Sequence, residues 1–267
     1  NPGSEDAFRL LDHFGGAREI FEAARADLSN VVRADSAIIA KITRHDIDKA
    51  RDILRACREL DIDILPYDSE EYPKRLTGIR GRPLLLYARG HVDGLNERLC
   101  VGGVGTRNIT NYGGNATVQI CTDLCNAGAV IVSGGALGVD SYANCTAYNM
   151  GCDTVVVLGN GLANPYPSEN VELFRGISKH GMVISEYTPE APCSKYTFPE
   201  RNRIISGRCP CRRGWTGVGI SDNGGLRGET GETALRRSGL YRREIQLRYE
   251  QADPRRSLDL PLRCRYT

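Results

Sequence analysis

Cations interleaved with an aromatic residue stand in the segment KYTFPERNRIISG, from Lys195 to Gly207. Lys195, Arg201 and Arg203 could follow a phosphate backbone, while Phe198 could stack on a base of any identity. This combination is typical of single-stranded nucleic acid sites. The alternative, which composition alone leaves open, is that Phe198 packs in a core and the charges lie on a solvated helix start.

Three glycine-rich loops offer a second kind of chemistry, because each follows an apolar run and precedes a helical pattern. They are GVGTRNITNYG at 103–113, SGGALGVD at 133–140 and VLGNGLANPYPSEN at 157–170. Glycines let backbone N–H groups approach a phosphate, and the helix start adds partial positive charge. A single such loop is explained equally well by the need for a tight turn. The candidate phosphate contacts in these loops are Gly105, Thr106, Ser133, Gly134, Gly159 and Gly161.

Arg107 lies just beyond the first loop, where its guanidinium could reach a phosphate held by the backbone of residues 103–106. The loops do not match the nucleotide fingerprints. The motif G-x-x-x-x-G-K-[ST] is missing from the sequence, and Gly103-x-Gly105 lacks the later glycine of a dinucleotide turn. We therefore expect no nucleotide cofactor and no other cofactor.

Short apolar runs alternate with helical patterns from residue 64 to residue 207, and these elements must position the loops. Near-continuous apolar strands between helices are typical of a parallel sheet covered on both faces. We expect a doubly wound α/β domain with its ligand at the carboxyl ends of the strands. The expected strands are 83–87, 99–104, 129–132, 154–158 and 182–185, and the expected helices are 115–126, 139–149 and 168–179.

The first 60 residues are helical in pattern. Phe8, Leu11 and Phe14 repeat on one face, and Gly15-Gly16 separates them from a second helical stretch at 17–26. A third stretch, 46–60, carries an apolar stripe formed by Ile47, Ala50, Ile53, Leu54 and Cys57. Together they predict a small module over residues 1–62, resembling a helix-hairpin-helix, which could contact a DNA backbone or serve packing and protein docking.

Composition bounds the class of protein. The 267 residues carry a formal net charge of only +2, so a basic site must come from local placement. No apolar run approaches the roughly 20 residues of a membrane span, which predicts a cytoplasmic protein without a membrane partner. Most cysteines lie in apolar patterns, as buried thiols do. Cys121 and Cys125 have helical spacing and no partner pair, so we expect no zinc site.

In this order, GTRNITNYG, SGGALGVD, VLGNGLANPYPSEN, SEYTPEAP and FPERNRIISG resemble the motifs of the bacterial DNA-processing protein A (DprA/Smf) family. The segments DILPYDSEEYPKRL and PLLLYARG are similar to that family's lead-in to its sheet. The resemblance covers residues 4–207 and implies an extended Rossmann-like domain over 63–207.

The resemblance also implies a function. Members of the family bind single-stranded DNA, protect incoming DNA and load the RecA recombinase during natural transformation, and they are not known as enzymes. We therefore expect RecA and a second copy of the chain as partners. The resemblance places the contacts with single-stranded DNA on Arg107, Lys195, Phe198, Arg201 and Arg203. Asn202, in the same FPERNR element, is a further candidate for DNA binding.

Two positions depart from the family pattern. Leu137 stands where the family commonly has an arginine, and Asn144 stands where it often has a histidine. Losing a cation should weaken the attraction for phosphate and lower the salt dependence of binding.

Two other function classes stay open. A Rossmann-like phosphoribohydrolase would share the architecture, but its PGGxGTxxE-type signature does not occur in the sequence. Glu186 could serve as a carboxylate, although a structural role at a strand end is expected. The other class is a non-catalytic scaffold whose glycine-rich edge binds a protein or a small phosphorylated ligand.

The sequence changes character after Gly207. Residues 208–267 hold thirteen arginines and no lysine, without helical or strand period. A basic tail for nucleic acid is one interpretation. We favour a frameshift near Gly207, because permissible codons for residues 241–259, read one base later, can give the family-like string TNRLIREGALI.

A frameshift would remove the last strands of the sheet, leave an exposed edge and impair dimer contacts and RecA docking. Sequencing the encoding DNA tests this hypothesis. We expect a frame break near codon 208, and one uninterrupted frame there, shared by close relatives, would refute it.

Overall fold

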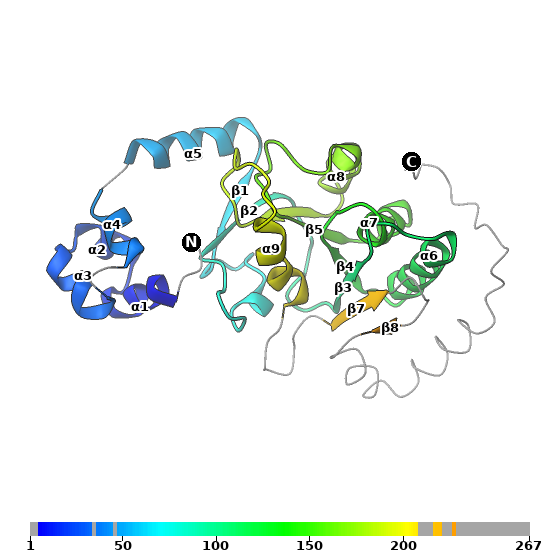
Figure 1. The fold of residues 1–267 in the computed structure, drawn as a ribbon, viewed down its shortest axis with the longest axis horizontal. Coiled ribbons are helices and arrows are strands. Elements are labelled where there is room, and N and C mark those ends of the chain that lie inside the picture. Colours follow the sequence, from blue (N-terminus) through cyan, green and yellow to red (C-terminus); the bar gives the residue numbers. More distant parts are fainter. Residues whose placement is uncertain (1–4, 34–35, 45–46, 208–215, 221–225, 228–267) are drawn as a thin grey trace.

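The computed structural model describes residues 5–33, 36–44, 47–207, 216–220 and 226–227 (Figure 1). Within these residues, the strands form one sheet in the order β1-β2-β6-β5-β4-β3-β7-β8. The strands are β1 (Asp63–Pro66), β2 (Leu85–Gly90), β3 (Cys100–Gly105), β4 (Val130–Ser133), β5 (Thr154–Leu158), β6 (Met182–Ser185), β7 (Thr216–Ile220) and β8 (Leu226–Arg227).

Helices and loops cover both faces of this sheet, as the apolar strands predicted. One face packs against α9 and the lead-in segment, with Ile204, Tyr72 and Leu76 in its core. The other face packs against α5 to α8, the last three of which lie together on the right of the sheet in Figure 1. These helices are α5 (Ile47–Glu59), α6 (Asn111–Asn126), α7 (Val139–Asn149), α8 (Val171–Ile177) and α9 (Thr197–Ser206), with short 3₁₀ turns at Lys74–Leu76 and Ser168–Asn170.

The centre of the sheet is parallel, which confirms the doubly wound α/β prediction. Strands β3, β4, β5 and β6 pair in parallel, so the loops that follow them leave at one edge. Strand β2, which lies between β1 and β6, runs antiparallel to β6, and this corrects the expectation of a purely parallel sheet. An apolar run predicts a strand but carries no information about its direction.

Strand β7 corrects the expectation that the edge of the sheet is left exposed. Residues 216–220, TGVGI, pair in parallel with β3, so the edge of β3 is covered there. β-Branched residues between glycines suit this role, because an open edge offers unpaired N–H and C=O groups. Apart from β7 and β8, the anomalous segment, including 241–259, lies outside the described residues, and the frameshift stays a prediction.

The N-terminal residues are helical as predicted, but they are divided differently. The helices are α1 (Glu5–Phe14), α2 (Ala17–Glu22), α3 (Arg25–Val31) and α4 (Ala37–Ile42), followed by α5. The single helix expected over 17–26 is interrupted at Ala23 and Ala24, whose backbones are extended. These helices enclose a core of their own, formed by Leu10, Ile20, Leu28, Val32 and Ile39.

The stripe predicted on α5 is only partly buried. Cys57 is buried, whereas Ile47 and Leu54 are exposed. A tie between the N-terminal helices and the lead-in to the sheet comes from aromatic contacts. Phe8 meets Tyr67 edge to face at 5.2 Å, and the guanidinium of Arg82 lies 3.6 Å from the centre of the Phe8 ring.

Two further expectations concern thiols and membranes. The cysteines within the described ranges are unpaired, and most of them are buried, as their apolar surroundings predicted. Throughout the part of the chain that the structure describes, every helix is too short or too polar to cross a bilayer.

Candidate nucleic-acid interface

The carboxyl edge of the parallel strands brings together the two side chains on which the sequence analysis relied most. Arg107 follows β3 and is exposed, and Phe198 lies in the first turn of α9. The guanidinium carbon of Arg107 is 5.5 Å from the centre of the Phe198 ring. A cation and an aromatic face from distant parts of the chain therefore share one surface.

Phe198 is half-buried because the loop after β5 supports its ring. A Cβ atom on Gly159 would lie 2.9 Å from the ring, so only glycine leaves room for it. On the same loop, Tyr166 contacts Phe198 with 5.7 Å between ring centres. The sequence analysis did not single out Tyr166, although it lies in a loop that had drawn attention.

Arg201 is 4% exposed and points into the protein. Its guanidinium donates to the carbonyl of Gly134 at 2.6 Å and to the carbonyl of Val157. These bonds fasten α9 to the ends of β4 and β5. They correct the expectation that Arg201 contacts phosphate, because its donors are used inside the fold, and they make it a positioning residue.

Ser133 and Gly134 are buried as well. The Ser133 hydroxyl donates to the carbonyl of Gly103 at 2.7 Å, and the Gly134 N–H donates to a carboxylate oxygen of Asp140 at 3.1 Å. The first bond joins the ends of β4 and β3, and the second joins the end of β4 to the start of α7. Both residues therefore shape the edge and do not face a ligand, which corrects their expected role.

Gly161 also has an internal role. Its N–H donates to the carbonyl of Ala191 at 2.8 Å, and a Cβ atom would collide with the backbone of Thr188 and Pro189. The glycine is needed because two loops approach each other closely here. Its N–H is used inside the fold, which corrects the expectation that Gly161 contacts a phosphate.

Arg203 is bound to Glu186. Its Nη2 lies 2.6 and 2.5 Å from the two carboxylate oxygens, and Glu186 is only 5% exposed. Burial raises the pKa of Glu186, and the charge of Arg203 opposes this. Glu186 thus has the structural role expected of it, and Arg203 is largely committed to neutralising it.

The remaining predicted residues face outward. Lys195 is exposed, with its ammonium 5.0 Å from the centre of the Tyr196 ring. Asn202 and Gly105 are exposed, and Thr106 is half-buried. With Arg107 and Phe198, these residues form the surface that we call the edge site: Gly105, Thr106, Arg107, Lys195, Phe198 and Asn202.

The turn between β4 and α7 supports the Arg107 loop. Gly138 has φ +81, and the N–H of Val139 donates to the carbonyl of Thr106 at 3.1 Å. Leu137 in this turn is exposed, so an arginine at this position could reach the phosphate of a bound ligand. Asn144 is buried instead and donates to the Thr154 hydroxyl at 2.8 Å. Only the first departure from the family pattern therefore bears on the surface.

Asp140 is a buried carboxylate behind the edge site that the sequence analysis did not select. Burial raises its pKa to about 6, against the opposing charge of Arg201 and the N–H groups of Ala136 and Gly134. Burial likewise lowers the pKa of Arg201. The signal in the sequence is that Asp140 is the single carboxylate of the loop SGGALGVD.

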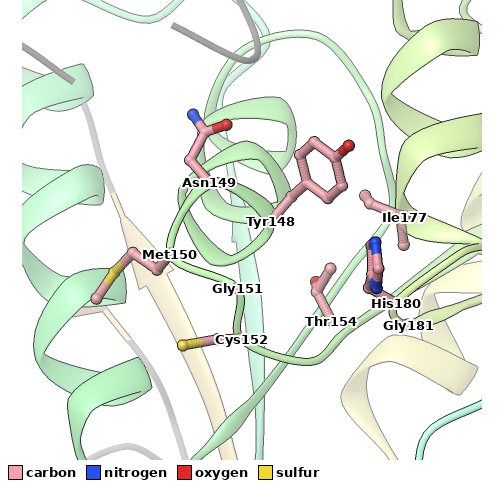
Figure 2. Close-up of a pocket in the computed structure, with 9 residues that line it drawn as sticks. All are labelled: Tyr148, Asn149, Met150, Gly151, Cys152, Thr154, Ile177, His180 and Gly181. Atoms are coloured by element: carbon pink, nitrogen blue, oxygen red, sulfur yellow. The ribbon is translucent and has the colours of Figure 1, made fainter. Parts of the chain in front are cut away.

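A hollow of about 490 Å³ lies at the opposite edge, beside the amino ends of β5 and β6. Figure 2 shows Tyr148, Ile177 and His180 on one side of Gly151, with the sulfur of Cys152 on the other. Among the residues that the structure describes, its lining contains no lysine or arginine. It therefore suits a phosphate backbone less well than the edge site does.

The titration of Asp140 gives a test of this arrangement. Its pKa is about 6 in the folded protein and 3.8 in an ordinary aspartate, so between these values the folded state binds more protons. The free energy of unfolding should therefore fall as pH rises through that window. Asp140→Asn keeps an acceptor for Gly134 but cannot titrate.

We expect the unfolding free energy of Asp140→Asn to depend less on pH between about 4 and about 6 than that of the wild type. Urea unfolding followed by circular dichroism at several pH values measures both. Two curves that run parallel through this window would show that Asp140 does not titrate as proposed.

Known proteins resemble this chain in sequence and in fold. A sequence model of the DNA recombination-mediator protein A family matches residues 63–211. DNA processing protein DprA of Bacillus subtilis is 38% identical over 155 residues, which cover 58% of this chain and 52% of that protein. Protein Smf of Synechocystis is 32% identical over 204 residues, covering 74% and 51%. The chain thus spans about half the length of the curated relatives it matches.

Two solved structures resemble the fold. DNA processing protein A of Streptococcus pneumoniae superimposes with a TM-score of 0.64 at 28% identity, over 77% of this chain and 70% of that one. The Helicobacter pylori protein, studied for its unique single-stranded DNA binding mode, gives 0.53 at 25% identity, over 72% and 97%. Because the family model matches more than half of its length, this chain belongs to the DNA recombination-mediator protein A (DprA/Smf) family.

Proposed function

We propose that this chain binds single-stranded DNA at the edge site. The observation that carries the proposal is the contact between Arg107 and Phe198, which places a cation and an aromatic ring on one exposed surface. The Helicobacter pylori relative, studied for its single-stranded DNA binding mode, supports the choice of ligand.

Phe198 and Arg107 would contact different parts of the bound DNA. Phe198 stacks on a base, and Arg107 binds a phosphate beside it. The contact between guanidinium and ring stabilises an exposed site by only about 0.5–1 kcal/mol, so Arg107 can exchange the ring for a phosphate at little cost. Stacking and phosphate contacts carry little base identity, so we expect no sequence preference.

The neighbouring exposed residues would extend the backbone contact. Lys195 adds a second cation, and Asn202 and the backbone N–H of Gly105 add donors. Arg201, Ser133 and Gly134 would act indirectly, by holding the strand ends and α9 in place. With a net charge of +2 for the chain, affinity depends on these few local cations.

The wider role that we propose is DNA processing during natural transformation in the cytoplasm. In this role the chain protects incoming single strands and loads RecA onto them, as a homodimer. Family membership supports this role. Since the chain spans about half of its curated relatives, the surfaces for RecA and for a second copy are a separate proposal from the edge site.

A catalytic role finds less support. Glu186, the carboxylate considered for a phosphoribohydrolase, is buried and paired with Arg203. A paired and buried carboxylate is poorly placed to take part in a reaction at the surface. We therefore propose a binding protein.

Substitution of the two central residues tests the edge site. Phe198→Ala should weaken single-strand binding about 5- to 150-fold, the equivalent of about 1–3 kcal/mol of stacking. Arg107→Ala should weaken it mainly at low salt, with the slope of log K against log salt shallower by about 0.7. Fluorescence anisotropy with labelled oligonucleotides measures both.

Arg51→Ala is a matched control for Arg107→Ala, because it removes an exposed arginine from α5. It should leave binding nearly unchanged. Equal binding of duplex and single strand, or indifference to both central substitutions, would count decisively against the site.

A gain of affinity should follow from restoring the missing cation. Leu137 is exposed next to the turn that supports Arg107, so Leu137→Arg should add one phosphate contact. Binding should tighten at low salt, and the salt slope should steepen by about 0.7.

The control is Leu99→Arg, which adds the same charge at an exposed position before β3, at the amino edge. Anisotropy titrations at several salt concentrations compare the two. The prediction is wrong if Leu99→Arg tightens binding as much as Leu137→Arg does.

A further inference from the structure

We infer that Tyr166 is a second base-stacking residue beside Phe198, so that the edge site holds two successive bases of a single strand. This inference rests on the proposed function and deepens it. It assigns a contact with single-stranded DNA to a residue that neither the motifs nor the charge pattern had selected.

The two rings contact each other from different elements. Tyr166 comes from the loop after β5 and Phe198 from α9, with 5.7 Å between ring centres and 49° between ring planes. Successive nucleotides of a stacked strand are about 3.4 Å apart. Rings that are farther apart and tilted would suit two bases splayed from each other, each against its own ring.

The surroundings of Tyr166 leave it available for a ligand. It is 45% exposed, whereas aromatic rings tend to be buried, and its hydroxyl has no hydrogen-bond partner within the described ranges. A core role would require burial or a bonded hydroxyl. The large exposed part of the ring is therefore unexplained by packing.

The backbone presents this ring with little freedom. Pro165 and Pro167 flank Tyr166 and restrict its backbone, and the carbonyl of Asn164 accepts a bond of 2.6 Å from the Asn160 amide. A ring held in this way loses little conformational entropy when a base stacks on it. The same loop supports Phe198 through Gly159, so the two rings keep their relative position.

The charge nearby fits a strand as ligand. Arg107 contacts Phe198, and Phe198 contacts Tyr166, so a cation and two rings adjoin one another. A phosphate at Arg107 and two bases at the rings would occupy neighbouring positions. An apolar protein partner would gain less from the cation.

Short oligonucleotides can count the bases that the site holds. Three oligonucleotides of equal length are compared: one is fully abasic, one carries a single thymine, and one carries two adjacent thymines. The sugar-phosphate backbone is therefore the same in all three. For the wild type, the first thymine should tighten binding about tenfold, and the second should tighten it about tenfold again. Fluorescence anisotropy gives the dissociation constants.

The variants separate the ring from the hydroxyl. Tyr166→Ala should keep the first gain and lose the second, while Tyr166→Phe should keep both. Tyr196→Ala is the matched control, since it removes an exposed tyrosine whose ring lies against Lys195. It should also keep both gains.

The outcomes distinguish this inference from the proposed function. If thymines add nothing to wild-type binding, or the wild type binds no single strand, the proposed function fails and Tyr166 fails with it. If the first thymine tightens binding but the second does not, or Tyr166→Ala keeps the second gain, the inference about Tyr166 alone is overturned. A loss of the second gain in Tyr196→Ala would also overturn it.

Discussion

The buried guanidinium of Arg201 is the constraint on which the edge of this sheet depends. It bonds the carbonyl of Gly134 at the end of β4 and that of Val157 in β5, with the carboxylate of Asp140 close by. A buried charge is costly unless it is paired and bonded, so these partners are needed together. They fasten α9 to the strand ends, and Phe198, one turn away on α9, is thereby held against the loop after β5.

This arrangement divides the four cations predicted for the site between two roles. Arg201 and Arg203 hold the fold through backbone carbonyls and Glu186, while Arg107 and Lys195 remain exposed. A chain of nearly balanced charge can therefore still offer a basic and aromatic surface at the carboxyl edge of the sheet. Such a surface favours a single strand over a duplex, because the rings need unpaired bases.

The sequence predicted the fold better than it predicted the roles of single residues. Apolar runs marked β3 to β6, because strands covered on both faces are apolar throughout. They could not give the direction of β2 or the pairing of β7 with β3, which depend on partners far along the chain. An arginine that contacts a phosphate and one that donates to the carbonyls at strand ends look alike in a sequence. The role of Arg201 could therefore be assigned only from the structure. Tyr166 was missed because its contact with Phe198 joins the loop after β5 to α9, which lies farther along the chain.

Hydrogen–deuterium exchange with and without an oligothymidine tests the central claim most directly, because it locates the bound strand without altering the chain. The account predicts slower exchange in the loops at 104–108 and 159–166 and in the segment 195–199, which meet at the carboxyl edge. Protection at 148–152 and 177–181, around the hollow at the amino edge, with no change at the carboxyl edge, would contradict it.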